Sequence, residues 1–348
     1  MSAITNHKRP GVYSAYDASG ITSARAGGRA VAVVAAMDGG DGTKSYVWYS
    51  YAQAVSDCGS TKITELARLA LKNGAGAVYG VPAGETYTAA FQTAAELENI
   101  AAVCCDSEDV TVQQALRDSV KACSEARQER IAVVCGGTDE GVTALVARAG
   151  KLNSERVVLV APGGLDSDGE TVGGAECAAA VAGLIAGQSD PAVPLGGAVL
   201  EGLRGLDYSY SDNEIDQLVS GGVTALESLA GEISVVRGVT TRTTTGGAAD
   251  GTWLDLTTIL VVDEVIPGIR QALRARFARA KNTAQTRGAI LSQVIVELED
   301  RVSREIIDGY EDVTVQALDS DPTVCLVEFS FTVAHGLNQI WLSAHITV

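Results

Sequence analysis

The sequence is short of basic residues and of long apolar runs, and each shortage excludes a class of protein. Lys and Arg total 26 against 43 Asp and Glu, a formal net charge of −17, which argues against a uniformly basic nucleic-acid-binding protein. No stretch approaches the ~20 apolar residues that a membrane helix requires, and residues 1–14 lack the apolar core of a secretory signal. We expect a soluble protein made in the cytoplasm, with no nucleic-acid partner and no direct membrane insertion.

The cysteines do not form the pattern of a disulfide framework. There are seven, an odd number, and none belongs to a CxxC pair. Most lie in or beside apolar runs, where a free thiol behaves as a small buried hydrophobe. Cys104 and Cys105 are adjacent in a predicted strand, so their side chains point to opposite faces and do not converge on a metal. The sequence predicts free thiols in a reducing compartment.

Catalytic motifs are also missing. Histidine occurs only in the terminal segments, as His7, His335 and His345, so no Ser-His-Asp set can form in the middle of the chain. The glycine-rich run at residues 39–45 is not a Walker loop, because Thr43 separates the last glycine from the lysine. We therefore predict no enzymatic activity, no cofactor and no metal site.

From about residue 30 to residue 190, short β-branched runs alternate with helical patterns. The predicted strands cover residues 29–36, 77–81, 100–104, 131–135 and 157–161, and helices of 11 to 21 residues lie between and after them. Strands that are apolar on both faces and alternate with helices indicate a parallel sheet covered on both sides. This predicts a Rossmann-like α/β domain over residues 21–190.

The following segment has another character. Residues 191–238 are interrupted by glycine and proline, and between residues 157 and 236 there are 12 acidic residues with Arg204 as the sole base. We interpret residues 191–238 as an acidic, loop-rich connector whose charged face is exposed to water.

Residues 239–334 predict a separate α+β domain. Strands are expected at 239–245 and 252–262 around a GGAADG loop, amphipathic helices at 266–281 and 289–307, and a strand at 323–334. Residues 335–348 are expected to form a C-terminal arm. In the strand expected from residue 339 onward, apolar residues occupy every second position. Its apolar face consists of Ile340, Leu342, Ala344, Ile346 and Val348. Residues 1–20, with no helical period, are either a loose tail or an N-terminal arm that orders against another molecule.

The two ends and the last third of the chain resemble contractile phage tail sheath proteins. The opening Pro10, Gly11, Val12 and Tyr13 is similar to the start of those proteins. Residues 238–245, followed by Trp253 and the run 256–266, resemble their C-terminal domain. Many sheath proteins carry extra outer domains, so this chain resembles a compact member.

The resemblance implies a structural role. A sheath subunit polymerises with itself as a helix of stacked rings around an inner tail tube, and it contracts to drive the tube through the target cell envelope. The implied further partners are baseplate and tail terminator proteins. The implied location is a virion tail or a phage-derived particle, assembled in the host cytoplasm.

The resemblance also implies roles for particular residues. Each arm is expected to add a strand to a sheet in a neighbouring subunit. The residues expected in these strands are Pro10, Gly11, Val12 and Tyr13 of the N-terminal arm and the five residues of the apolar face of the C-terminal arm. Residues 265–287 carry six basic and no acidic residues, which suggests a tube-facing helix; the alternative is internal pairing with Glu297, Glu299 and Asp300. The tube-facing candidates are Arg270, Arg274, Arg276, Arg279 and Lys281. The candidate hinges beside the arms, which are otherwise ordinary turns, are Gly20, Gly27, Gly28 and Gly336.

The sequence is also compatible with two other functions. A doubly wound α/β sheet hosts many nucleotide-binding enzymes. A different self-assembling shell protein would share the acidic, non-catalytic character.

Overall fold

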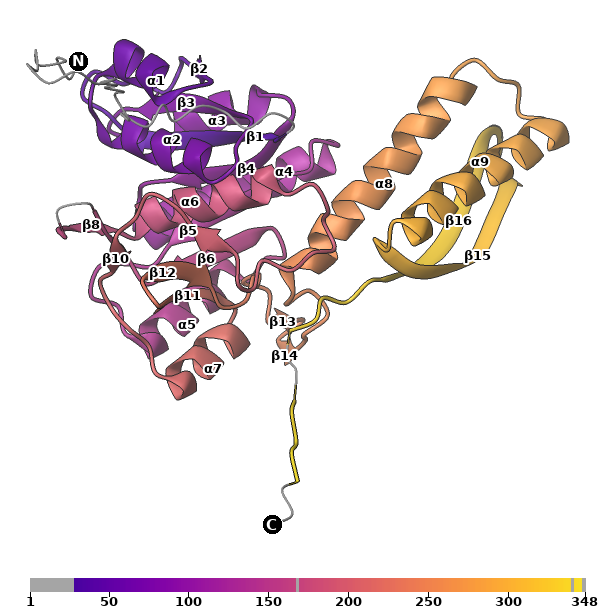
Figure 1. Cartoon of the computed structure of the whole chain (residues 1–348). Helices are drawn as coiled ribbons and strands as arrows, with labels where there is room; N and C mark the ends of the chain where they lie inside the picture. Colours follow the sequence, from indigo (N-terminus) through magenta and orange to yellow (C-terminus); the bar gives the residue numbers. More distant parts are fainter. Residues whose placement is uncertain (1–27, 167–168, 339–340, 346–348) are drawn as a thin grey trace, which may run out of the picture.

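The structure is a computed structural model that describes residues 28–166, 169–338 and 341–345. It consists of an α/β body and an elongated C-terminal unit that projects from one side of the body (Figure 1). Residues 341–345 lie apart from both, as an extended stretch of chain (Figure 1). None of the helices in the described ranges has the length and apolarity needed to cross a membrane.

The body is built on a nine-stranded sheet. Its order is β2-β3-β1-β4-β5-β6-β11-β12-β9. The six strands from β3 to β11 are parallel, and the three outer strands β2, β12 and β9 pair antiparallel. The strands are β1 (Ala30–Ala36), β2 (Tyr46–Trp48), β3 (Ala77–Ala83), β4 (Ile100–Cys105), β5 (Ile131–Cys135), β6 (Val157–Ala161), β9 (Val199–Leu200), β11 (Val223–Leu229) and β12 (Glu232–Val235).

Helices cover both faces of this sheet. One buried cluster joins the sheet to α1 (Tyr51–Cys58), α2 (Lys62–Lys72) and α6 (Gly174–Gly187). The opposite cluster joins it to α3 (Thr88–Glu96), α4 (Val110–Glu125), α5 (Val142–Leu152) and α7 (Asp212–Ser220). The predicted mixed α/β fold with a mostly parallel, doubly covered sheet is therefore confirmed.

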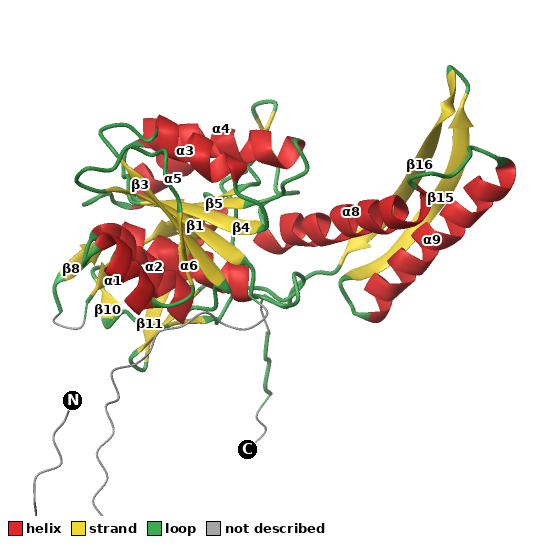
Figure 2. Ribbon diagram, turned by 90° about the horizontal axis from the view of Figure 1, so that it is seen from above, coloured by secondary structure: helices red, strands yellow, loops and turns green. Residues whose placement is uncertain are grey.

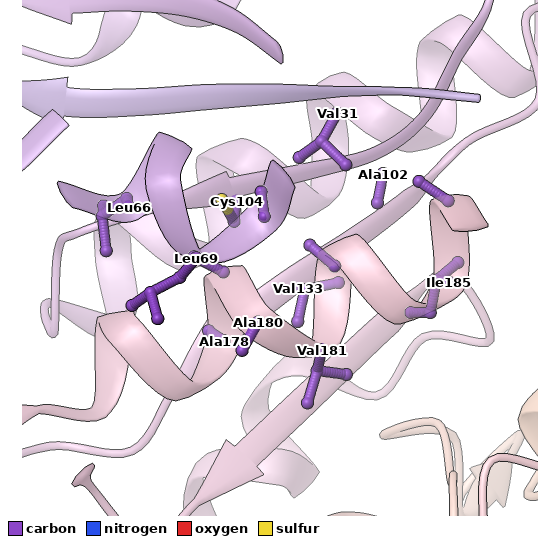
Figure 3. Packing of buried hydrophobic residues seen from close by; sticks show 14 of the residues in the cluster. Val31, Leu66, Leu69, Ala102, Cys104, Val133, Ala178, Ala180, Val181 and Ile185 are labelled. Carbon is purple, nitrogen blue, oxygen red and sulfur yellow. The ribbon is translucent and has the colours of Figure 1, made fainter. Parts of the chain in front are cut away.

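Small residues let α6 lie close to α2. Figure 3 shows Leu69 of α2 beside Ala178 and Ala180 of α6, with little side-chain volume between the two helices. A methyl group at Gly183 would overlap the backbone carbonyl of Ala70. The alanine- and glycine-rich sequence of α6 thus sets the depth at which this helix packs onto the sheet.

The C-terminal unit has its own core. The long helix α8 (Leu256–Phe277) leads out of the body, α9 (Ala284–Ser303) returns beside it, and the hairpin of β15 (Ile307–Leu318) and β16 (Asp321–Val333) packs on both (Figure 2). Short strands complete the fold. They are β7 (Gly164–Leu165), β8 (Thr171–Gly173) and β10 (Gly205–Leu206) in one small sheet, and β13 (Thr244–Thr245) and β14 (Ala248–Ala249) in another.

The interpretation of residues 191–238 as a connector is wrong. This segment supplies β9, β11, β12 and α7 to the body, and Val223 and Leu226 of β11 are buried in the two cores. Its glycines and prolines lie mainly in turns between short elements, which is why it lacks a long periodic run. The acidic side chains do lie at the surface: of those described between residues 157 and 236, only Glu176 is buried.

The strands predicted at residues 239–245 and 252–262 are also largely wrong. The first is reduced to β13 and an isolated bridge between Val239 and Asp255. The second is the start of α8, which begins ten residues before the predicted helix. Its β-branched residues are buried by tertiary packing, which outweighs their strand propensity.

All seven cysteines lie in the described ranges as free thiols, as predicted. Cys104, Cys123 and Cys135 are buried, and Cys325 is half-buried.

Candidate assembly interface

The hairpin β15–β16 is a sheet with two open sides. Its strands pair from Ile307 with Val333 to Leu318 with Asp321, and no third strand joins them among the described residues. One face packs on the helices through alternating apolar side chains, including Tyr310, Phe329 and Phe331. The outer edges of a 12-residue and a 13-residue strand therefore present backbone N–H and C=O groups that can pair with added strands.

The C-terminal segment lies outside this hairpin. The Ala334 N–H donates to the Ile306 carbonyl at 3.4 Å, and the residues described after it belong to no helix or strand. Leu337 and Leu342 are 74% and 92% exposed, and Ala344 is exposed as well. This part of the chain thus displays apolar side chains that its own body does not cover.

Most of the predicted arm residues cannot be placed. Leu342 and Ala344 are described, whereas the remaining arm residues lie outside the described ranges: Pro10, Gly11, Val12, Tyr13, Ile340, Ile346 and Val348.

The basic residues of α8 and of its connection to α9 divide into a paired and an unpaired group. Arg270 turns toward the body, where its Nη1 lies 3.0 Å from Oε1 of Glu129, and its assignment to a tube-facing surface stays a prediction. Arg276 donates to Oε1 of Gln293 at 2.5 Å. Arg274, Arg279 and Lys281 are exposed and have no ion-pair partner in the described part of the chain.

The alternative of internal pairing on α9 is wrong for these basic residues. Glu297 pairs with Arg301 at 2.7 Å, and Asp300 lies 3.5 Å from Arg304. Glu299 accepts the hydroxyl hydrogen bond of Tyr310, an interaction that raises the pKa of that tyrosine. The three α9 carboxylates are therefore already used by partners outside residues 265–287.

An ion pair that the sequence did not reveal joins α8 to the body. Arg156, just before β6, donates to both carboxylate oxygens of Asp263, at 2.8 and 2.9 Å. Both side chains are largely buried, at 12% and 7% exposure. Because the partners are more than 100 positions apart, no local pattern could have identified the pair.

The hinge prediction is wrong at Gly28. A methyl group there would overlap the carbonyl of Gly74 and the N–H of Gly76, so this glycine serves close backbone packing. The next residue is fixed as well, because the Arg29 N–H donates to the Ala186 carbonyl. Gly336 contacts the ring of Pro194, and a methyl group would lie 2.8 Å from its Cγ. Gly20 and Gly27 lie outside the described residues.

A cavity of about 510 Å³ opens at the carboxyl ends of β5 and β6. Its wall includes Glu108, Asp139, Glu140, Asp207 and Glu214. A hydrogen bond from Arg148 holds the pKa of Glu140 below its ordinary value, whereas burial raises the pKa of Asp207. This concentration of carboxylates repels phosphate groups.

A doubly wound sheet commonly binds nucleotides where its strand order reverses, here between the carboxyl ends of β1 and β4, and the Asp106 carboxylate lies at this place. Asp106 accepts the backbone N–H of Ala36 at 3.1 Å and the hydroxyl of Tyr87 at 2.7 Å. Burial raises the pKa of Tyr87, which keeps its hydroxyl a donor. No cluster of three or more metal-ligating side chains occurs among the residues that the structure describes.

Comparison with known families decides the identity. Residues 80–241 match the phage tail sheath protein central domain, and residues 248–347 match the phage tail sheath C-terminal domain. The chain belongs to the phage tail sheath family. The match covers the α/β body from β3 onward and the whole C-terminal unit, so both halves of the structure are sheath domains.

Two curated tail sheath proteins are similar in sequence. The tail sheath protein of Bacillus phage SP01 is 29% identical over 257 residues, covering 72% of this chain and 43% of that protein. The tail sheath protein of Mycobacterium phage Bxz1 is 27% identical over 316 residues, covering 83% of this chain and 52% of that protein. The chain therefore spans about half the length of the curated relatives it matches.

Solved structures share the fold. A chain in the cryo-EM structure of the anti-feeding prophage baseplate superposes with a TM-score of 0.73 at 15% identity, over 99% of this chain and 100% of that one. The helical sheath of the same particle in its contracted state gives a TM-score of 0.72 at 14% identity, over 98% and 99% of the two chains. A sheath tail protein from Listeria innocua gives 0.72 at 14% identity, over 90% and 93%. At these identities the likeness shows the common fold.

Proposed function

We propose that this chain is the structural subunit of a contractile sheath. It polymerises with itself as a helix around an inner tube and contracts to drive that tube through the envelope of a target cell. Its place is a phage tail or a phage-derived particle assembled in the host cytoplasm, with baseplate and tail terminator proteins as further partners. The family membership and the sheath names of its relatives support this role.

The observation that carries the proposal is the open hairpin β15–β16 beside an uncovered terminal segment. Long strand edges without neighbours favour strand addition from another chain. Residues 335–348, when extended, reach about 45 Å at ~3.3 Å per residue, far enough to leave their own subunit. A strand donated by each copy to the next is a heterologous contact, which propagates as an open helix.

The N-terminal arm, residues 1–20, is proposed to fill the second open edge. Two donated strands then complete a four-stranded sheet around each hairpin. Backbone hydrogen bonds supply the affinity, and the alternating apolar residues Leu342 and Ala344, with Ile340, Ile346 and Val348, set the register. These donated strands are proposed to stay paired during contraction, while the α/β bodies of neighbouring subunits change their contacts with one another.

The inner tube is the proposed partner of the outer part of α8. Arg274 lies in the last turn of α8, and Arg279 and Lys281 lie in the connection to α9. None of the three has an ion-pair partner in the described ranges, and Figure 1 shows the C-terminal end of α8 far from the body. Exposed ionic contacts are individually weak and are screened by salt. Contacts of this kind can break when the sheath contracts and slides past the tube.

The rival function of a nucleotide-binding enzyme has less support. The strand order β3-β1-β4-β5-β6 favours the Rossmann-like description of the body. However, Asp106 occupies the crevice between β1 and β4, and the nearby cavity is lined with carboxylates. A phosphate group would meet negative charge at both places, which supports a role without catalysis.

Negative-stain electron microscopy of the purified full chain tests the proposal. Tubes of uniform width are the expected result. Flat sheets or closed cages would instead support a different shell protein, and small closed oligomers would support the enzyme.

A further inference from the structure

A groove of about 450 Å³ lies between α8 and α9, on the C-terminal unit. Its floor on α8 is made of small residues, Gly268, Ala272 and Ala275, which recur along one side of the helix. Glu297 and Arg301 of α9 form the opposite wall. The groove is therefore a surface that a polypeptide backbone can approach closely.

Arg301 is the unusual residue of this groove. It is only 5% exposed, and its Nη1 donates to both the carbonyl and the carboxylate of Glu297, each at 2.7 Å. Its Nε is buried with no hydrogen-bond partner in the described ranges. Its Nη2 lies against Gly268, at a place that a methyl group would occupy. A buried N–H without an acceptor is costly, so the guanidinium has donor capacity that only an added group can use.

The opposite wall supplies an acceptor. Pro267 lies inside α8 and has no N–H, so the carbonyl of Asp263, four residues earlier, lacks its helical donor. Both residues line the groove. A carbonyl without its i+4 helical donor and a guanidinium N–H without a partner in the described ranges thus occur among the residues that line the groove.

The charged groups of the groove are already neutralised. The carboxylate of Asp263 is held by Arg156, that of Glu297 is held by Arg301, and that of Glu264, the third acidic residue of the lining, lies 3.8 Å from Arg304. An ionic ligand would find no free counter-charge at these positions. The complementary ligand is uncharged and carries both a carbonyl and an N–H, as a peptide group does. An extended segment offers such groups, whereas a helix has already paired its own.

We propose that the groove between α8 and α9 binds an extended, uncharged polypeptide segment, namely the C-terminal segment of a second copy. This inference rests on the proposed polymerisation. Residues 329–348 contain no Asp, Glu, Lys or Arg, which matches a groove with paired charges. Leu337 and Leu342 are exposed in their own subunit, so the segment is available to another one. In the assembly, residues just before the donated strand cross the groove, and a peptide carbonyl accepts from Arg301.

Site-specific photo-crosslinking tests this contact. A benzoylphenylalanine residue is placed at Gln271, an exposed residue at the side of the groove, and the control protein carries it at Val296, which is 60% exposed on α9 and does not line the groove. Assembled particles are prepared from a mixture of heavy- and light-isotope copies and irradiated. The expected product joins position 271 to residues 335–345 of a different copy, with no such product from position 296.

Crosslinks from position 271 to residues 1–27, to another surface or only within one chain would overturn the inference while leaving polymerisation intact. If the full chain does not polymerise, the proposed sheath function fails separately. The groove is then tested by titrating a labelled peptide of residues 333–345 onto the chain truncated after residue 334. Saturable binding that Ala275→Trp abolishes and Val296→Trp leaves unchanged supports the groove, and absence of binding rejects it.

Discussion

Arg156 and Asp263 form a two-point ion pair that joins the α/β body to the long helix of the C-terminal unit. Both donor–acceptor distances are below 3 Å, at 2.8 and 2.9 Å, and both side chains are largely buried. Arg270 and Glu129 make a second, more exposed connection between the same parts. These pairs hold α8 at a defined position on the body, as expected if each subunit moves as one unit.

Removing one partner of the buried pair is predicted to destabilise the protein. In Asp263→Ala the Arg156 guanidinium stays buried without its counter-charge, at an expected cost of about 3–5 kcal/mol in the free energy of unfolding. The matched control is Glu264→Ala, since Glu264 is exposed and lies 3.8 Å from Arg304; its expected cost is about 0–1 kcal/mol. Denaturant unfolding measures both. Equal stability of the two variants would contradict the role of the pair.

Two glycine-to-alanine substitutions are predicted to have opposite effects. Gly80 of β3 lies against the indole of Trp48, which is fully buried, so Gly80→Ala forces a repacking that costs about 1–3 kcal/mol. Gly150 lies inside α5 with open space around it, so Gly150→Ala stabilises the helix by about 0.5–1 kcal/mol. Thermal unfolding of the two variants compares them directly. A stabilising Gly80→Ala would mean that Trp48 is not packed as described.

The ion pair of Glu140 with Arg148 is predicted to make stability depend on pH. Hydrogen bonding to Arg148, at 2.7 and 2.8 Å, keeps the pKa of Glu140 below its ordinary value of 4.5 in the folded state. A lowered pKa stabilises the fold above the unfolded-state value, and the effect is lost as the pH falls through the folded-state value. Glu140→Gln should therefore be less stable than the parent at neutral pH, with the difference narrowing below pH 4.5.

Unfolding by urea between about pH 3 and pH 7 checks this prediction. A difference that stays constant over this whole range would show that Glu140 acts through packing, without a contribution from its charge.

The outer basic residues of α8 are predicted to govern attachment to the tube. Arg274→Glu combined with Arg279→Glu should leave the free energy of unfolding nearly unchanged, because neither residue has an ion-pair partner in the described ranges. Co-sedimentation with purified tubes should decrease strongly, and attachment of the parent should weaken with added salt. The control, Lys121→Glu with Arg127→Glu, makes the same change of charge on the exposed surface of the body. Equal attachment of both double variants would reject the tube-facing role.

Sequence patterns predicted correctly the helices and strands whose buried residues recur at a regular spacing. Five of the six parallel strands, namely β1, β3, β4, β5 and β6, are apolar on both faces, and helices such as α2 carry clear caps and stripes. The run at residues 256–266 misled prediction because its β-branched residues are equally typical of a strand. In the structure this run is the start of α8, and Leu256 and Ile259 are buried in the body core from its first turn onward.

The candidate interface was predictable in part. The alternation of the C-terminal arm indicated an extended segment, and the local charge pattern indicated a basic surface on residues 265–287. The open strand β15 was missed because its core-facing Tyr310 and Val313 are interrupted by charged residues and a register shift. The pairing of Arg270 with Glu129 and of Arg156 with Asp263 depends on long-range folding, so a single sequence carries no local signal for it.

The central claim is that copies of this chain hold one another by exchanging terminal strands. The most direct test compares the full chain with a variant lacking residues 335–348 by negative-stain electron microscopy, with circular dichroism as the check on folding. The account predicts tubes from the full chain and folded, dispersed monomers from the truncated one. Tubes of unchanged width formed by the truncated protein would contradict it.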